Sequence, residues 1–335
     1  MTATMSVRRG DPAGLRDRRA GWRVLACLSA GLALSDTLRA LAGAEVSRGT
    51  QVIVWDVRLP VAVMALLVGA ALALAGAEMQ TVLENPLAEP FTLGVSSAAA
   101  LGAAVAIILG LTIPGLPGVW SVSANAFLFA VGALLLLQLL GRIRGGGPEV
   151  LVLFGVALNF TAGALLSLVQ FVASADALQQ LVFWSMGSLA SAQWPGVAMI
   201  GVILLAAAPF SFAAAWKLTA LRLGEDQARS FGVDVTRLRR WTLLRVSLLS
   251  AAAVSMVGVI GFVGLAGPHI ARMLVGENHR VFLPASLLTG ALVMSLASTL
   301  SKTVVPGVLL PVGLVTSLIG LPIFFALILR GRRRG

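Results

Sequence analysis

The sequence "LRLGEDQARSFGVDVTRLRR", residues Leu221 to Arg240, is a polar segment in the middle of a very apolar chain. It carries eight charged side chains in twenty positions, whereas the whole chain is 12% charged and 58% hydrophobic. Apolar sequence runs for about twenty residues on each side, which is the length that a helix needs to cross a bilayer. The segment is therefore expected to be a loop at a membrane surface between two spanning helices.

The overall composition supports the same conclusion. A soluble chain is about a quarter charged and about half apolar, but this chain has a mean hydropathy of +0.94. Its apolar segments are long and uncharged, unlike the alternating strands of an outer-membrane barrel. The sequence predicts an all-α integral membrane protein.

Ten candidate spans follow from a window of about 20 apolar residues. They are 22–42, 59–80, 92–111, 119–140, 150–172, 195–216, 241–260, 262–276, 283–302 and 308–329. The eighth is short and contains "GPHIAR", so we expect it to be bent or only partly embedded, and nine spans is the alternative. Residues 22–330 then form a single transmembrane domain between basic tails at 1–21 and 331–335.

The basic residues fix the expected orientation. With the N-terminus in the cytoplasm, the inside segments hold twenty of the twenty-five Lys and Arg residues, and the outside receives chiefly Arg48, Arg58 and Lys302. The positive-inside rule explains this bias, and an even number of spans places both termini in the cytoplasm. The net charge of +11 is thus assigned to topology and not to nucleic-acid binding.

The N-terminal region has some features of a signal peptide. A basic leader precedes Val24 to Leu34 and the small-residue segment "ALAGAE". However, Asp36 and Arg39 interrupt the region before the cleavage site, so a retained first helix is favoured. The single cysteine, Cys27, excludes an intrachain disulfide framework.

Catalytic and energy-coupling motifs are missing from the sequence. Neither of the two lysines lies in a Walker A frame, and no H-E-x-x-H or C-x-x-C pattern occurs. His269 and His279 lack partners at metal-ligand spacing, so no metal site, no catalytic residue and no directly bound cofactor is expected. The alternatives are an ion-coupled secondary carrier that uses Glu78, whose other interpretation is an interfacial carboxylate, and a membrane enzyme that uses His269.

The central loop, about 217–240, has the signals of a short capped helix. Gly224 precedes two acids, Arg229 follows near the end, and Gly232 permits a left-handed stop. Ala228 and Phe231, three residues apart, are expected to share an apolar face. The loop is either a docking surface or a solvated segment on the lipid headgroups.

Several segments, in order, resemble one family of transport proteins. They are "VWDVRLPVAVMALLVGAALALAGAEMQTVLENPLAEPFTLGVSSAAALGA" (54–103), "LFGVALNFTAGALLSLV", "LVFWSMGSLASAQW", "LRLGEDQARSFGVDVTRLRR", "GVIGFVGLAGPHIARMLVGENHRVFLPASLLTGA" and "LPVGLVTSLIGLPIFFALIL". Together they resemble bacterial ABC importer permeases of the FecCD type, which take up iron–siderophore complexes, haem and cobalamin. The resemblance covers about residues 22–330.

The resemblance implies a type II ABC importer permease in the cytoplasmic (inner) membrane. Such a permease has ten helices, pairs with a second permease subunit, the same or homologous, and works with a separate ABC ATPase and an extracytoplasmic substrate-binding protein. ATP is used by the partner and not by this chain. Ferric siderophores are the favoured cargo, with haem and cobalamin as alternatives.

The resemblance also assigns residues to roles. The ATPase-coupling segment comprises Leu223, Gly224, Glu225, Ala228, Arg229, Phe231 and Gly232. The cytoplasmic gate comprises Asn85 and Leu87, and the pathway lining comprises Asn159 and Phe160. Arg58 and Lys302 match positions that dock the binding protein.

Three outer-face positions depart from the family pattern. Val61 stands in place of a second Arg, Ser298 in place of an Asp, and Leu310 in place of a Glu. We therefore expect docking to depend on fewer charges, or on different ones, than in the relatives.

Overall fold

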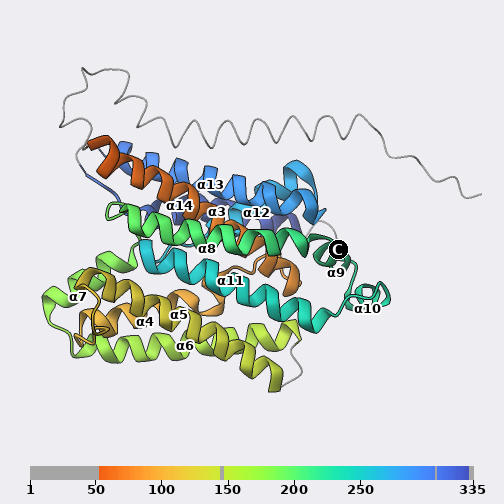
Figure 1. The fold of residues 1–335 in the computed structure, drawn as a ribbon, viewed down its shortest axis with the longest axis horizontal. Helices are drawn as coiled ribbons and strands as arrows, with labels where there is room; N and C mark the ends of the chain where they lie inside the picture. The colour runs from red at the N-terminus through yellow and green to blue at the C-terminus, as the bar shows by residue number, and fades with distance from the viewer. Residues whose placement is uncertain (1–52, 144–146, 306–307, 332–335) are drawn as a thin grey trace, which may run out of the picture.

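A computed structural model describes residues 53–143, 147–305 and 308–331, which form a bundle of helices (Figure 1). The elements are η1 (Ile53–Arg58), α3 (Leu59–Val82), η2 (Pro90–Leu93), α4 (Val95–Ile107), α5 (Gly118–Ile143), α6 (Pro148–Phe171), α7 (Ala175–Ser185), α8 (Trp194–Ala213), α9 (Ala215–Leu221), α10 (Glu225–Ser230), α11 (Val235–Val257), α12 (Val263–Val275), α13 (His279–Thr303) and α14 (Val312–Gly331). Within these ranges no strand occurs, which confirms the all-α class.

The predicted spans agree with the described helices. Nine of the ten ranges each coincide with a helix in the described part of the chain, and the first, 22–42, lies outside it. Among the residues that the structure describes, six helices are long and apolar enough to cross a membrane, and the shorter apolar helices are Val95–Ile107, Val263–Val275 and Val312–Pro322. Residues 1–21 and 332–335 also lie outside the described ranges, so the cytoplasmic placement of the termini stays a prediction.

Helix α12 is too short to cross a bilayer alone. Its 13 residues extend about 20 Å, against a hydrocarbon core of about 30 Å. The chain between α11 and α12 is non-helical, with positive φ at Gly258 (76°) and at Phe262 (66°). The eighth span is thus a short helix, and its partial embedding in the membrane stays a prediction.

The two ends of the bundle match the two predicted membrane sides. Three segments assigned to the cytoplasm meet at the end where α10 projects (Figure 1): Arg222 pairs with Glu277 at 2.5 Å, and Arg142 lines a cavity together with Arg240. Arg58 and Lys302, assigned to the outside, share a different cavity. The order of the helices thus follows the alternation that the basic residues predicted.

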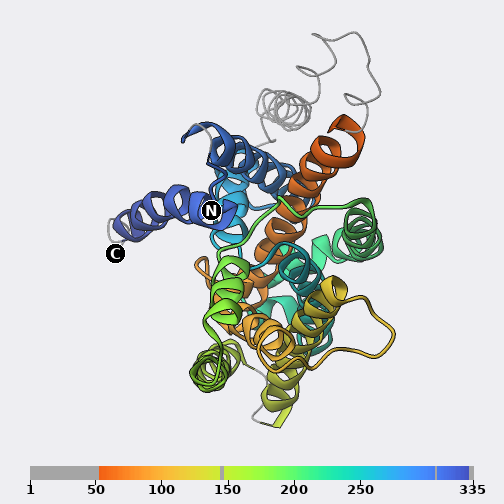
Figure 2. The same cartoon turned by 90° about the vertical axis from the view of Figure 1, so that its left-hand side faces the viewer.

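Helix α3 forms the centre of the bundle. It packs against α8, α11, α12 and α13, and Figure 2 shows it, in orange, between the blue C-terminal helices and the green and cyan helices α8 and α11. A helix that is apolar around its whole circumference is expected to be buried. Glycines permit a close contact with α13, because a Cβ on Gly69 would lie 2.3 Å from the carbonyl oxygen of Gly290.

Two short helices were not predicted. α7 lies between α6 and α8, and its N-terminus is capped by Ser174, whose hydroxyl oxygen accepts from the backbone N–H of Ala177 at 3.3 Å. α9 joins α8 to α10. Both are too short to register in a search for membrane spans, and Asp176 and two glutamines interrupt the apolar sequence of α7.

Candidate functional site

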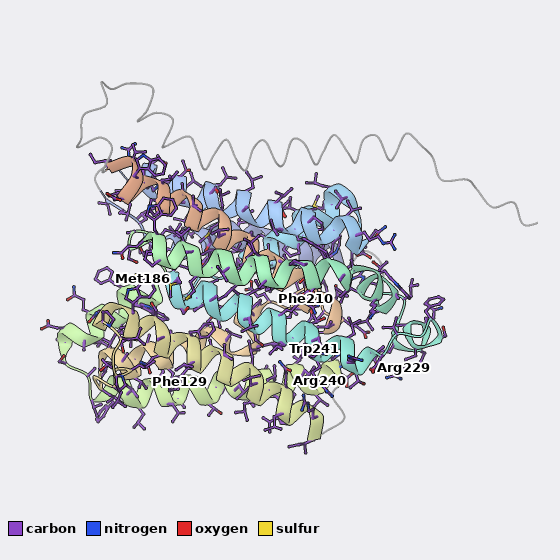
Figure 3. The ribbon with its side chains drawn as sticks, viewed as in Figure 1. Phe129, Met186, Phe210, Arg229, Arg240 and Trp241 are labelled. Carbon is purple, nitrogen blue, oxygen red and sulfur yellow. The ribbon has the colours of Figure 1, made fainter. Side chains whose placement is uncertain are left out.

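The polar loop folds into the short capped helix that its sequence predicted. α10 comprises Glu225–Ser230, with Gly224 as its N-cap at φ 109° and Gly232 just beyond its end at φ 79°. Both φ values lie where a side chain is strained, so glycine is the residue that suits each stop. Figure 1 shows α10 projecting from one end of the bundle, and Figure 3 labels Arg229 on it.

The expected apolar face of α10 is wrong in one respect. Ala228 is fully buried against the protein, whereas Phe231 is 55% exposed, so the two side chains do not share an exposed face. The exposed apolar residues are instead Phe231 at the end of α10 and Leu223 just before it, which is 61% exposed. Phe231 is the C-cap residue of α10, and its backbone N–H still donates to the carbonyl oxygen of Gln227 at 3.2 Å, so the two side chains differ in burial and not in helical spacing.

A charged network fixes α10 to the rest of the molecule. Glu225 accepts hydrogen bonds from Arg229 at 2.9 Å and from Arg239 of α11 at 2.6 Å. The Nε atom of Arg239 also donates to the carbonyl oxygen of Val82 at 3.0 Å. Val82 is the last residue of α3, so a single guanidinium connects α10, α11 and the end of the central helix.

The last turns of α3 make further polar contacts with neighbouring helices. Arg245 of α11 pairs with Glu78, with Nη2 and Oε1 2.6 Å apart. Gln80 accepts from Arg272 of α12 at 3.0 Å, and Thr81 bonds the Nε2 atom of His279 on α13 at 2.8 Å. Such buried polar contacts hold helices in one register, because an alternative packing would leave charges unpaired.

The geometry corrects the interpretation of Glu78 as an interfacial carboxylate. Its side chain is completely buried, and the Arg245 side chain that neutralises it is 11% exposed. A carboxylate that is held by two nitrogens of an arginine is suited to a structural role. Glu78, the candidate acid of an ion-coupled carrier, is therefore part of an ion pair between α3 and α11.

The predicted gate residues lie together in the loop between α3 and α4. The side-chain oxygen of Asn85 accepts from the backbone N–H of Leu87 at 2.9 Å, which fixes the start of "NPLAEP" as a tight turn. Both residues are partly buried. The loop begins right after Val82, the residue that Arg239 contacts, so α10 and the predicted gate are joined through one side chain.

Glu89, in the same loop, reaches the start of α12. It is 6% exposed, and its Oε1 atom accepts from the backbone N–H of Phe262 at 3.4 Å. Burial raises the pKa of the Glu89 carboxyl from 4.5 to about 7, although the Phe262 hydrogen bond acts in the opposite direction. The carboxylate thus satisfies a helix N-terminus where few solvent contacts are available.

The two predicted pathway residues, adjacent on α6, have different environments. The side-chain oxygen of Asn159 accepts from the Ser97 hydroxyl of α4 at 2.6 Å. Phe160 is 73% exposed, and so are other large apolar residues of α6, including Leu153 (70%) and Phe171 (87%). Phe160 therefore belongs to the face that α6 presents outward, and Asn159 belongs to the contact between α6 and α4. Their role in a pathway stays a prediction.

The outer-face positions converge on one cavity of about 350 Å³, the outer cavity. Arg58, Val61, Ser298, Lys302 and Leu310 all line it, although they come from η1, α3, α13 and the segment before α14. The two basic residues and the three departures from the family pattern are thus neighbours. Ser298 and Leu310, which stand in place of acids, therefore change the surroundings of Arg58 and Lys302.

The third hypothesis is a membrane enzyme that uses His269. Across residues 53–143, 147–305 and 308–331, no group of three or more His, Cys, Asp or Glu residues is placed to hold a metal ion. His269 lies on α12.

Sequence reasoning missed the partners that position the site. No pairing partner was predicted for Arg239 or for Arg245 from the sequence. An arginine inside the apolar range 241–260 is costly unless it is paired, and this cost was the available signal for Arg245 and Glu78. No comparable signal existed for Glu89 and Phe262, which are 173 positions apart.

The membrane-length apolar helices and the projecting capped helix define a multi-pass membrane protein, and the comparisons place it among transport permeases of the cytoplasmic membrane. The chain belongs to the FecCD transport family, whose model matches residues 22–330. This finding confirms the family that the sequence motifs indicated.

Individual relatives agree with this assignment. The hemin transport system permease protein HmuU of Yersinia pestis is 38% identical over 282 residues, covering 84% of this chain and 84% of the relative. The vitamin B12 import system permease protein BtuC of Klebsiella pneumoniae is 36% identical over 295 residues, covering 88% and 87%. A solved inward-facing structure of a metal-chelate type ABC transporter is similar with a TM-score of 0.81 and 32% identity, covering 92% of this chain and 99% of that chain.

Proposed function

We propose that this chain is the permease subunit of an ATP-driven importer of ferric siderophore complexes. Two permease subunits, identical or homologous, form the pathway between them, and the exposed apolar face of α6 contributes to it. The chain binds no cofactor itself, because ATP is hydrolysed on a separate ATPase subunit. Its relatives transport hemin and vitamin B12, so haem and cobalamin are the competing cargoes.

One observation carries the proposal: the chain of contacts from α10 through Glu225 and Arg239 to Val82. We propose that Phe231 and Leu223, both exposed beside α10, dock in a groove of the ATPase. When the ATPase pair closes, α10 moves as a rigid unit, because packed elements shift between discrete arrangements. The Arg239 contacts transmit this motion to the loop that holds Asn85 and Leu87.

The outer cavity is the proposed contact with a substrate-binding protein. Arg58 and Lys302 would meet acidic residues of that partner, and opposite charges mainly raise the association rate and fix the orientation. The apolar and hydroxyl side chains of Leu310, Val61 and Ser298 would replace charge pairs with shape complementarity.

The test of this function uses the permease reconstituted with its ATPase and binding protein. Phe231→Asp places a charge in the proposed groove and is expected to weaken ATPase binding on the order of tenfold or more. Gly232→Pro is expected to break the stop of α10, because proline cannot adopt the observed φ of 79°. Both variants should hydrolyse ATP without importing cargo, at unchanged expression.

Phe231→Leu is the matched control, because it keeps an apolar side chain and should import normally. Normal import by Phe231→Asp would contradict the coupling role. The cargo is tested separately, by comparing uptake of a ferric siderophore, haem and cobalamin in the same vesicles. ATP-dependent uptake of cobalamin or haem alone would overturn the siderophore assignment and leave the transporter class intact.

A further inference from the structure

A second cavity of about 350 Å³ lies at the α10 end of the molecule, between α5, α6 and α11. We call it the inner cavity. Its charged lining residues are Arg142 of α5 and Arg239 and Arg240 of α11, and no acidic residue is among its lining. A cavity with three guanidinium groups and no carboxylate in its wall is suited to an anion.

Two of the three arginines are available for a ligand. Arg239 is engaged with Glu225 and Val82. Within the described ranges, Arg142 and Arg240 make no ion pair, and both are exposed. The nearest acid on α11, Asp234, accepts from the backbone N–H of Arg237 at the helix start. The cavity therefore keeps an excess of positive charge.

The wall of the inner cavity also holds an unsatisfied polar group. The Nε2 atom of Gln138 is buried and has no hydrogen-bond partner in the part of the chain that the structure describes. A buried amide donor without an acceptor costs about 1–3 kcal/mol. A ligand oxygen in the cavity would satisfy it, as would the hydroxyl of Thr236 for a second oxygen.

The position of the inner cavity along α5 and α11 indicates the source of the anion. Arg240 and Trp241 lie in the half of α11 that is nearest α10 (Figure 3), and Trp241 is 52% exposed, as is typical of an aromatic residue at a membrane interface. On α5, Leu139 (53% exposed) and Ile143 (71%) are four residues apart and so share one face. The cavity thus combines a cationic interior at headgroup level with an adjacent exposed apolar stripe.

We propose that the inner cavity binds the phosphate group of an anionic phospholipid of the inner leaflet. Arg142 and Arg240 hold the phosphate oxygens, Gln138 donates its buried amide N–H, and the acyl chains lie along Leu139 and Ile143. Basic pockets between helices on the cytoplasmic side are suited to such headgroups. Because Arg239 forms part of the wall and also holds Glu225, the bound lipid lies beside the contact that positions α10.

Native mass spectrometry of the purified full-length permease tests the site. The protein is extracted from nanodiscs that contain equal amounts of phosphatidylglycerol and phosphatidylcholine, and the retained lipids are compared. We expect selective retention of phosphatidylglycerol, reduced on the order of tenfold by Arg142→Gln together with Arg240→Gln. The matched control, Arg237→Gln together with Arg280→Gln, removes the same charge from exposed arginines at the same end and should retain the lipid.

Three outcomes would overturn the proposal. Equal retention of both lipids, or an equal loss in both double variants, would show that the cavity has no selective site. A soluble anion would be the ligand if inorganic phosphate raised the melting temperature of the lipid-depleted permease as much as phosphatidylglycerol does. Equal melting temperatures of parent and variants in phosphatidylcholine alone would establish that the substitutions leave the fold intact.

Discussion

Arg239 and Glu225 form the contact that joins α10 to the core of the protein. The Nη2 atom of Arg239 lies 2.6 Å from the Oε1 atom of Glu225, and its Nε atom donates to Val82 at the end of α3. The Arg239 side chain is 8% exposed and the Glu225 side chain 26%, so this contact is partly shielded from water and from salt. It gives a short exposed helix a fixed relation to the central helix.

The first prediction concerns this contact. A double-mutant cycle with Glu225→Gln and Arg239→Gln should give a coupling energy of about 1.5–3 kcal/mol, because a charge-assisted hydrogen bond is lost in either single variant. Thermal unfolding of the purified permease measures it. Arg237→Gln, two residues away and exposed, is the control and should change the stability by less than about 0.5 kcal/mol. An additive cycle would show that the contact does not hold α10.

The second prediction separates a structural Glu78 from an ion-coupling one. Glu78→Gln leaves Arg245 buried without its counter-charge and should destabilise the permease by about 3–5 kcal/mol. Combining Glu78→Leu with Arg245→Met removes both charges and should restore much of the stability and the transport. A coupling acid would behave differently, because the double variant would then be stable but inactive in uptake.

The third prediction tests the packing of α3 on α13. Gly69→Ala would place a Cβ 2.3 Å from the Gly290 carbonyl oxygen, so the helices must separate, at a cost of about 1–3 kcal/mol. Gly132→Ala on α5 is the control, since its Cβ meets nothing within 4 Å. The control should be neutral or stabilise by about 1 kcal/mol through helix propensity. Similar melting temperatures for both variants would contradict the close contact.

The fourth prediction is a pH dependence that originates at Glu89. Its pKa is raised to about 7 from 4.5, so the folded protein holds a proton that the unfolded chain releases at lower pH. The associated stability is complete below about pH 4.5 and is lost as the pH rises through about 7, by up to about 3 kcal/mol. Melting temperatures measured across this window should fall in the parent and stay flatter in Glu89→Gln. An identical pH profile in the variant would contradict the assignment.

The sequence was sufficient for some parts of the account and not for others. Apolar run length and arginine bias predicted the spans and their alternation, and the glycines and charges around Glu225 predicted α10, because these signals are local. Contacts such as Glu225 with Arg239, or Glu89 with Phe262, depend on how helices pack, and no local pattern encodes them. Ala228 illustrates the limit, since its spacing from Phe231 did not reveal that Ala228 would be buried and Phe231 exposed.

Transport measurements in proteoliposomes test the central claim most directly. The permease is reconstituted with its ATPase and binding protein, and accumulation of a radiolabelled ferric siderophore is followed against its gradient. We expect accumulation only when the ATPase and ATP are both present, and none with the permease alone under any ion gradient. Uphill accumulation by the permease without the ATPase would contradict the account.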